Sequence, residues 1–195
     1  MGERTPYQPL TFLDRLTVVL YRAGILLAAA SIATAAVLLW QAQPRLHAGT
    51  VRIALGAFLL GNLLSAAFIH LYARSFRRAI RTLGLLAAAA LAGVLLGSPS
   101  PVETLLLQWY GALTLGLFAA VLAFVAVKEA FCFRLNEGYV IALLLPLLVA
   151  AHVLGAPGEA LRVLLSVTAV LLLVFTARKV AQPLHYDIGD KTQYR

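Results

Sequence analysis

Six long apolar stretches, joined by short polar segments, constrain what this chain can fold into. They run from Leu16 to Trp40, Ile53 to Tyr72, Ile80 to Gly97, Val102 to Val127, Tyr139 to Gly155 and Ala160 to Ala177. At about 1.5 Å per helical residue, each holds enough apolar length to cross about 30 Å of hydrocarbon, the third and fifth being the shortest. Only helices satisfy their own backbone in lipid without closing a barrel, and no strand-like alternation is present. We therefore predict an all-α, polytopic membrane protein, a bundle of six transmembrane helices.

The composition excludes an ordinary soluble domain. Hydrophobic residues make up 62% of the 195 residues and charged residues only 12%, about half of what soluble domains carry. The single cysteine excludes an internal disulfide or a C-x-x-C pair. The net charge of +8 would suggest nucleic acid in a soluble protein. Here the basic residues stand at the ends of the apolar stretches, so we predict anionic lipid as a partner and no nucleic acid.

The basic residues also predict an orientation. With six spans, thirteen of the sixteen Lys and Arg residues fall on the side that holds both termini, and only Arg45, Arg52 and Arg162 fall on the other. Cytoplasmic loops carry the excess of Lys and Arg, so both termini are predicted to be cytoplasmic. Residues 1–15 then form a cytoplasmic segment, residues 16–177 the transmembrane domain and residues 178–195 a cytoplasmic tail.

A cluster of four arginines follows the second stretch. The loop sequence RSFRRAIR, residues 74–81, holds Arg74, Arg77, Arg78 and Arg81. We predict that they contact anionic lipid head groups at the cytoplasmic surface, at about 1 kcal/mol each. Ordinary control of topology explains the same residues and is compatible with this role.

The segment KEAFCFRLNEG, residues 128–138, packs four charges, two phenylalanines and the only cysteine between two apolar stretches. If the fourth helix continued to Asn136 it would exceed the bilayer, so it must tilt, protrude or turn along the interface. The segment is then an interfacial connector or a cytoplasmic docking surface. The residues of the predicted docking surface are Lys128, Glu129, Phe131, Cys132, Phe133 and Arg134. A membrane enzyme acting through Cys132, Glu129 and His185 is a third alternative.

Five polar residues are predicted to lie at membrane depth, where such groups are costly. They are Asn62, His70, Glu103, Gln108 and His152. We expect the Asn62 amide to bond a neighbouring helix as structural glue. Glu103 and Gln108 lie at depths close to His152, where a Glu–His pair could carry a proton, although Glu103 facing outer water is the simpler expectation.

The two histidines fail as a joint haem site. Six spans place His70 and His152 near opposite membrane faces, roughly 15 Å apart in depth by helical rise, whereas axial ligands of one haem must lie much closer together. Binding of haem or chlorophyll by a single histidine stays open, and otherwise we predict no cofactor. No motif for phosphate, zinc or an activated nucleophile is present, so no catalytic or metal-binding residue is predicted.

Three segments resemble a known family. They are LDRLTVVLYRAG at residues 13–24, KEAFCF after the fourth stretch, and YDIGDKTQYR at the end of the chain. They look like domain of unknown function 2301, an uncharacterised family of bacterial integral membrane proteins found mainly in photosynthetic bacteria. The resemblance implies a multi-span protein with no assigned activity. It also favours a role beyond a passive loop for the residues Lys128, Glu129, Phe131, Cys132 and Phe133.

Our interpretation is a multi-pass protein of the bacterial inner membrane, or of the thylakoid membrane in a photosynthetic bacterium. It would act as a non-catalytic assembly, scaffold or regulatory subunit of a larger membrane protein complex, through its cytoplasmic loops. The alternative is a small transporter or channel for an apolar or weakly polar solute, suggested by Pro146, by Asn62 and by glycine faces such as Gly93 and Gly97.

Overall fold

The computed structural model describes residues 9–41 and 48–193, and the regular structure within those ranges is entirely helical. The long helices are α1 (Phe12–Trp40), α2 (Ala48–Ala67), α3 (Arg74–Gly97), α5 (Trp109–Phe133), α6 (Glu137–Val153) and α7 (Gly158–Val180). The short elements are α4 (Pro101–Leu107), α8 (His185–Ile188) and the 3-10 helix η2 (Lys191–Gln193). The predicted all-α fold is confirmed.

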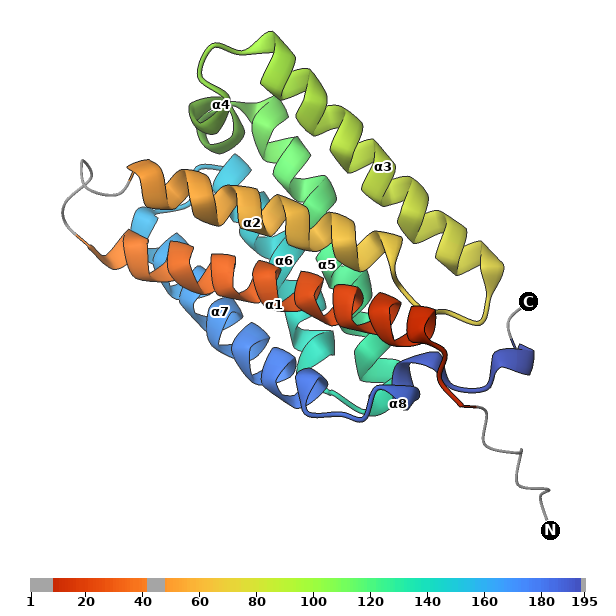
Figure 1. The fold of residues 1–195 in the computed structure, drawn as a ribbon. Coiled ribbons are helices and arrows are strands. Elements are labelled where there is room, and N and C mark those ends of the chain that lie inside the picture. Colours follow the sequence, from red (N-terminus) through yellow and green to blue (C-terminus); the bar gives the residue numbers. More distant parts are fainter. Residues whose placement is uncertain (1–8, 42–47, 194–195) are drawn as a thin grey trace.

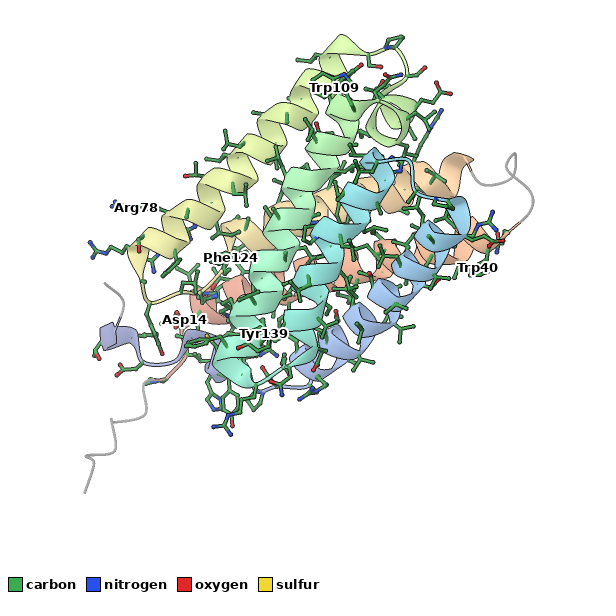
Figure 2. The ribbon with its side chains drawn as sticks, turned by 180° about the vertical axis from the view of Figure 1, so that it is seen from behind. Asp14, Trp40, Arg78, Trp109, Phe124 and Tyr139 are labelled. Carbon is green, nitrogen blue, oxygen red and sulfur yellow. The ribbon has the colours of Figure 1, made fainter. Side chains whose placement is uncertain are left out.

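Successive long helices run in opposite directions, so the bundle has two ends (Figure 1). The proximal end holds the start of α1, the loop at residues 68–73, the turn between α5 and α6, and α8. The distal end holds α4 and the loop between α6 and α7. Figure 2 shows Asp14 and Tyr139 toward the proximal end and Trp40 and Trp109 toward the distal end.

Five helices, α1, α2, α3, α5 and α7, are long and apolar enough to cross a membrane. Helix α6 is also apolar but has only 17 residues, which span about 25 Å at about 1.5 Å per residue. That is slightly less than the roughly 30 Å of a hydrocarbon core. The fold is that of a polytopic membrane protein with five helices of full spanning length.

Helices α1 and α5 carry much of the core. Helix α1 packs against α2 and α7, and α5 packs against α3 and α6. The backbones of α1 and α2 approach closely at Gly24 and Gly61, because a Cβ built on Gly24 would lie 2.5 Å from the Gly61 carbonyl oxygen. Helices in lipid associate through such small residues.

The second helix begins and ends five residues earlier in the sequence than predicted. We expected it to reach Tyr72, but α2 ends at Ala67, and the following loop turns Ile69 into the core at 2% exposure. His70 therefore lies in a loop. The four arginines expected in a loop lie instead on the first turns of α3, which begins at Arg74.

The fourth apolar stretch is not one helix. Gln108 has an extended backbone that separates α4 from α5, so residues 101–107 add no length to the α5 span. At the other end, Arg134 adopts a left-handed conformation with φ of 55° and terminates α5 at Phe133. The single helix expected over the fourth stretch is thus wrong, and KEAFCFRLNEG forms the last turns of α5, a tight turn and the start of α6.

Candidate functional site: a buried ion cluster

Six polar or charged side chains from four helices are buried together at the proximal end. This ion cluster comprises Tyr21 and Arg22 of α1, Lys128 and Glu129 of α5, Lys179 of α7 and Asp187 of α8. None of them is more than 7% exposed. Ionised side chains are almost never this buried unless they are paired. Their partners therefore define what the cluster does.

Glu129 is the centre of the cluster. Its Oε1 accepts hydrogen bonds from the Tyr21 hydroxyl and from Nζ of Lys128, both at 2.6 Å. Its Oε2 lies 2.6 Å from Nζ of Lys179, an ion-pair contact without hydrogen-bond alignment. One carboxylate thus joins α1, α5 and α7.

Asp187 supplies the second carboxylate and comes from the end of the chain. Its Oδ2 accepts from Nε of Arg22 at 2.7 Å and lies 2.5 Å from Nη2 of the same guanidinium. Its Oδ1 accepts from Nζ of Lys179. Asp187 therefore fastens α8 to α1 and α7.

The Arg22 guanidinium is saturated with acceptors. Besides Asp187, it donates from Nη1 to the carbonyl of Gln182 at 2.5 Å and to that of Val180 at 3.3 Å, and from Nη2 to the carbonyl of Pro183 at 3.0 Å. These carbonyls belong to the end of α7 and the turn that follows it. A planar guanidinium with five donors suits this convergence of carboxylate and carbonyl oxygens.

The cluster holds three cations and two carboxylates, and aromatic rings face its ammonium groups. Nζ of Lys179 lies 3.9 Å from the ring centroid of Phe133, and Nζ of Lys128 lies 5.2 Å from the same centroid. Nζ of Lys128 also lies 5.1 Å from the Tyr21 centroid. The negative faces of these rings stabilise cations removed from water.

Residues 184–193, named here the C-terminal strap, close the proximal end over the cluster. Ile188 of the strap is buried, and Gly189 has φ of 60° beneath Tyr72, where a Cβ would lie 1.8 Å from the Tyr72 hydroxyl oxygen. That oxygen accepts from the backbone N–H of Asp190 at 2.8 Å. Nζ of Lys191 pairs with Asp14 of α1 at 2.5 Å. The predicted tail is thus folded onto the bundle.

His70 borders the cluster from the loop between α2 and α3. Its Nε2 lies 3.1 Å from the Thr17 hydroxyl, and its ring meets the Tyr21 ring edge-on with centroids 6.5 Å apart. Burial and, to a smaller extent, the nearby Lys128 ammonium together lower the pKa of His70 from 6.5 to about 4. His70 is therefore neutral at pH 7.

The structure divides the predicted docking residues into two groups. Lys128 and Glu129 point inward as members of the ion cluster, and Phe133 is half-buried against it. Phe131, Cys132 and Arg134 are exposed. A docking role stays a prediction, carried by the exposed members.

The predicted lipid-contacting arginines are mostly exposed. Arg74, Arg78 and Arg81 are open to the surroundings, while half-buried Arg77 donates from Nη1 to the carbonyl of Leu71 at 2.5 Å. Their contact with lipid head groups stays a prediction.

The contacts of the other four predicted polar residues agree with expectation only in part. Asn62 is fully buried, but its Nδ2 donates to the carbonyl of Phe58 in its own helix at 2.8 Å, so the expected bond to a neighbouring helix is wrong for this group. Nε2 of His152 lies 2.7 Å from the Leu106 carbonyl oxygen of α4. Glu103 is exposed, as the simpler expectation had it, and Gln108 is exposed at the break before α5.

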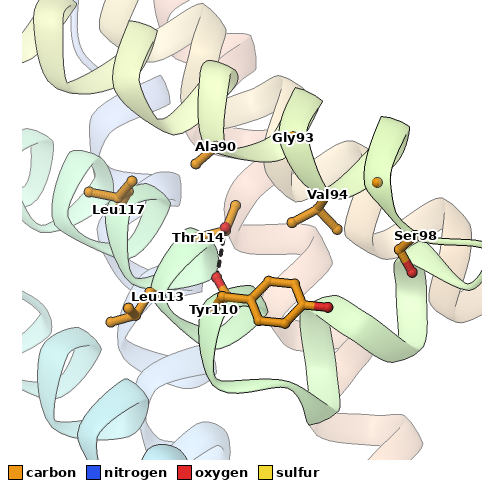
Figure 3. A pocket seen from close by; sticks show the side chains of 9 residues that line it. Ala90, Gly93, Val94, Ser98, Tyr110, Leu113, Thr114 and Leu117 are labelled. Atoms are coloured by element: carbon orange, nitrogen blue, oxygen red, sulfur yellow. Dashed lines mark hydrogen bonds between the residues drawn. The ribbon is translucent and has the colours of Figure 1, made fainter.

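A shallow groove of about 570 Å³ lies between α3 and the first half of α5 (Figure 3). Gly93 and Gly97 line it, and a Cβ built on either would meet nothing within 4 Å, so these glycines do not form a packing face with another described helix. The Thr114 hydroxyl in the groove donates to the Tyr110 carbonyl at 2.9 Å. The groove therefore presents an apolar surface.

Sequence reasoning missed four members of the ion cluster: Tyr21, Arg22, Lys179 and Asp187. An available signal was the position of Arg22 and Lys179, both inside or beside apolar stretches, where ionisable residues face inward and pair. Among the described residues, no group of three His, Cys, Asp or Glu side chains is placed to hold a metal ion.

Comparison with known proteins identifies the family. The family described as "Uncharacterized integral membrane protein (DUF2301)" matches residues 64–195, which include the α5, α7 and α8 members of the ion cluster. An uncharacterized protein of Haemophilus influenzae is 32% identical over 187 residues, covering 96% of this chain and 95% of its own length. No solved structure matches the chain. The resemblance predicted from the sequence is confirmed, and the chain belongs to the DUF2301 family of integral membrane proteins.

Proposed function

We propose that this protein is a non-catalytic assembly, scaffold or regulatory subunit that docks a partner membrane protein through the proximal end of its bundle. The observation that carries the proposal is the pairing of the buried charges with one another. Both carboxylates of the ion cluster are engaged by Lys or Arg side chains, and the result is that α1, α5, α7 and α8 are held in one arrangement. Paired, buried ions specify geometry and leave no reactive group open.

The proposed docking surface consists of Phe131, Cys132 and Arg134 on α5 and the following turn, and Tyr186 on α8. Phe131 is 79% exposed and Tyr186 is 51% exposed. The half-buried Phe133 ring stacks on the Tyr186 ring with centroids 6.5 Å apart, and this contact connects α8 to α5. Aromatic and Arg side chains are enriched among residues that dominate interface energies. A surface fixed in advance by the ion cluster loses little entropy on binding.

In this proposal α6 is the sixth span and the proximal end is cytoplasmic. An apolar helix of 17 residues lies at the short end of the range for transmembrane helices. The described Lys and Arg residues of the distal end are Arg52 and Arg162, and all others lie at the proximal end. Arg4, Arg45 and Arg195, which also enter the predicted charge division, lie outside the described residues. A bacterial inner or thylakoid membrane is the proposed location.

Anionic lipid is the proposed partner of the arginines on α3. Arg74, Arg77 and Arg78 occupy the first turns of a helix that has no acidic residue there. Cations are unfavourable beside the positive end of a helix dipole, whereas anions are favourable. Lipid phosphate groups would relieve this arrangement by contacting both the guanidinium groups and the free N–H groups of the first turn.

The alternative function is transport of an apolar or weakly polar solute, and the groove between α3 and α5 favours it. The two segments that flank the groove, residues 82–102 and 104–127, contain no Asp, Glu, Lys or Arg. An ion-coupled carrier normally places such residues at membrane depth. Filling the groove with Gly97→Leu should abolish flux of an apolar solute into proteoliposomes if transport is the function.

The native cysteine allows a direct test of docking. Cys132 is the only cysteine and lies within the proposed surface. A maleimide photocrosslinker attached to Cys132 in native membranes should give one discrete crosslinked species. That species should be lost in Arg134→Glu, because reversal of a charge in the contact opposes binding.

The matched control moves the thiol to a lipid-facing position of α6. In Cys132→Ser with Leu143→Cys, the crosslinker sits on a side chain that is 72% exposed in a spanning helix. It should give only diffuse lipid and protein adducts. Equal products from both positions, together with a solitary protein after gentle detergent extraction, would refute docking at the proximal end.

A further inference from the structure

We propose that Arg22 and Lys179 form an anion-binding site beneath the C-terminal strap, and that Asp187 fills it as an internal ligand in competition with an external anionic oxygen group. The group is a phosphate or carboxylate, carried by a phospholipid head group or by a soluble anion. The inference goes beyond the proposed docking function and does not depend on it.

The long helices bury more cations than carboxylates at the ion cluster. Arg22, Lys128 and Lys179 come from α1, α5 and α7, and the only carboxylate that these helices place among them is Glu129. Three buried cations then face one anion. Buried charges without a counter-charge are strongly unfavourable, so the bundle requires a second anion at this place. Asp187 meets that requirement from outside the long helices.

The way Asp187 is held resembles ligand recognition. Its Oδ2 is contacted by Nε and Nη2 of Arg22 at 2.7 and 2.5 Å, and its Oδ1 by the Lys179 ammonium. The side chains of Arg22 and Lys179 are 7% and 0% exposed. Carbonyls of Val180, Gln182 and Pro183 orient the guanidinium independently of Asp187. A guanidinium joined by an ammonium is a general receptor for phosphate and carboxylate oxygens.

The strap is the element best placed to detach. Its regular structure is a helix of four residues and a 3-10 helix of three residues, so lifting it breaks no long helix. Its ion pair between Lys191 and Asp14 is partly exposed, with side chains 33% and 20% accessible. Segments without a long helix open at a lower free energy than the helical core.

The position of the site suggests where an anion would come from. Lys128, Glu129 and Lys179 lie in the last two turns of α5 and α7, whose ends face the phospholipid phosphates in the proposed topology. Arg134 and Arg178 are exposed at the same end and would attract anions toward it. A soluble phosphate would find the same ligands, so the test separates the two sources.

A buried cysteine in the strap reports its opening. Ile188 is 4% exposed, so Cys132→Ser with Ile188→Cys places the only thiol beneath the closed strap. We would measure the rate of thiol labelling of the full chain in phosphatidylcholine vesicles and in phosphatidylglycerol vesicles. In the phosphatidylcholine vesicles, the rate would also be compared between inorganic phosphate and chloride at equal ionic strength. Adding Asp187→Asn to this variant should raise the rate at least about tenfold, because it removes the internal anion.

Each outcome decides the proposal. Faster labelling in phosphatidylglycerol alone supports a lipid head group, and faster labelling with phosphate supports a soluble anion. Labelling rates that are equal in all vesicles and salts would overturn the proposal, whether or not Asp187→Asn opens the strap. Asp187 would then be a fixed structural partner of Arg22 and Lys179 and not a ligand that an external anion can replace.

A second measurement covers failure of the cysteine variant to fold. Asp187→Ala leaves the three cations with room for an added carboxylate, so acetate and phosphate should raise its unfolding temperature above that in chloride at equal ionic strength. The wild-type protein, with the site filled, should show a smaller rise. No rise in Asp187→Ala would contradict an anion site.

Discussion

The two ends of the bundle handle polar side chains in opposite ways. At the proximal end, the acidic groups Asp14, Glu129, Glu137 and Asp187 each pair with a basic side chain, two of them fully inside the protein. At the distal end, Glu103 and Glu159 are exposed. The contact between α1 and α7 there is made at the surface, where the Trp40 indole donates to Ser166 at 3.0 Å and Arg162 lies over the Trp40 ring.

The difference indicates that the ends contribute unequally to a specific structure. Exposed polar contacts add little free energy, because water and lipid head groups replace them readily. Buried pairs are different, because removal of one partner strands the other in a low-dielectric interior. Substitutions of similar chemistry should therefore be tolerated at the distal end and costly at the proximal end.

The largest expected effect is that of Glu129→Gln. This change leaves the Lys128 and Lys179 ammonium groups without their shared carboxylate, and breaking a buried ion pair costs about 3–5 kcal/mol. Glu103→Gln is the distal control and should change the free energy of unfolding by less than about 0.5 kcal/mol. Thermal unfolding in detergent, followed by the fluorescence of Trp40 and Trp109, measures both. Equal losses of stability would show that the ion cluster has no special weight.

Two left-handed glycines give the next comparison. Gly155, in the distal loop, has φ of 72° with open space around it, so Gly155→Ala should cost only the backbone strain, about 1 kcal/mol. Gly189→Ala should cost about 3 kcal/mol, because its φ of 60° and ψ of −144° are nearly restricted to glycine and its new methyl group displaces Tyr72. Chemical denaturation of both variants would check this difference. A Gly189→Ala protein as stable as Gly155→Ala would show that the strap is not fixed under Tyr72.

His70 gives a pH test of the proximal end. The folded protein holds its pKa at about 4, below the ordinary value of 6.5, so the unfolded chain binds the proton more readily between these values. Stability from this group is therefore fully present above about pH 6.5 and is lost as pH falls toward 4. Between pH 7 and 5 the loss should be about 2 kcal/mol. The wild-type protein and His70→Gln should differ in the slope of unfolding temperature against pH over this interval, and parallel curves would contradict the burial of a neutral His70.

Much of the fold could be predicted because lipid leaves few choices. An apolar stretch that must cross a membrane forms a helix, and five of the six predicted stretches overlap a helix of spanning length. The departures arise from local chemistry that hydropathy does not register. Gln108 breaks the fourth stretch without a proline or glycine at that position, and Ile69 is buried from a loop although its residue type fits a continued helix.

The ion cluster could not be predicted because its partners are far apart in the sequence. Arg22 and Asp187 are separated by 165 residues, and Tyr21 and Glu129 by 108. Hydropathy places each residue near a membrane surface but does not say which face of its helix meets which neighbour. The segment around Glu129 was singled out by its composition and by resemblance, and the YDIG tail by resemblance, without any indication that they touch.

Arg178 and Lys179 show this limit at adjacent positions and give the smallest expected effect. Both are basic residues in the last turn of α7, yet the Arg178 side chain is 51% exposed and pairs with Glu137 at 2.5 Å, whereas Lys179 is fully buried between Glu129 and Asp187. An exposed pair contributes about 0–1 kcal/mol, so Arg178→Gln should shift the unfolding midpoint only slightly, and added salt should reduce the shift further. Lys179→Gln removes the buried cation that Glu129 and Asp187 share, and it should unfold the proximal end at a lower temperature than Arg178→Gln does. Arg178→Gln and Glu137→Gln should be measured side by side. A large loss of unfolding temperature in Arg178→Gln would mean that exposed ion pairs also stabilise the bundle, and the contrast between its two ends would fail.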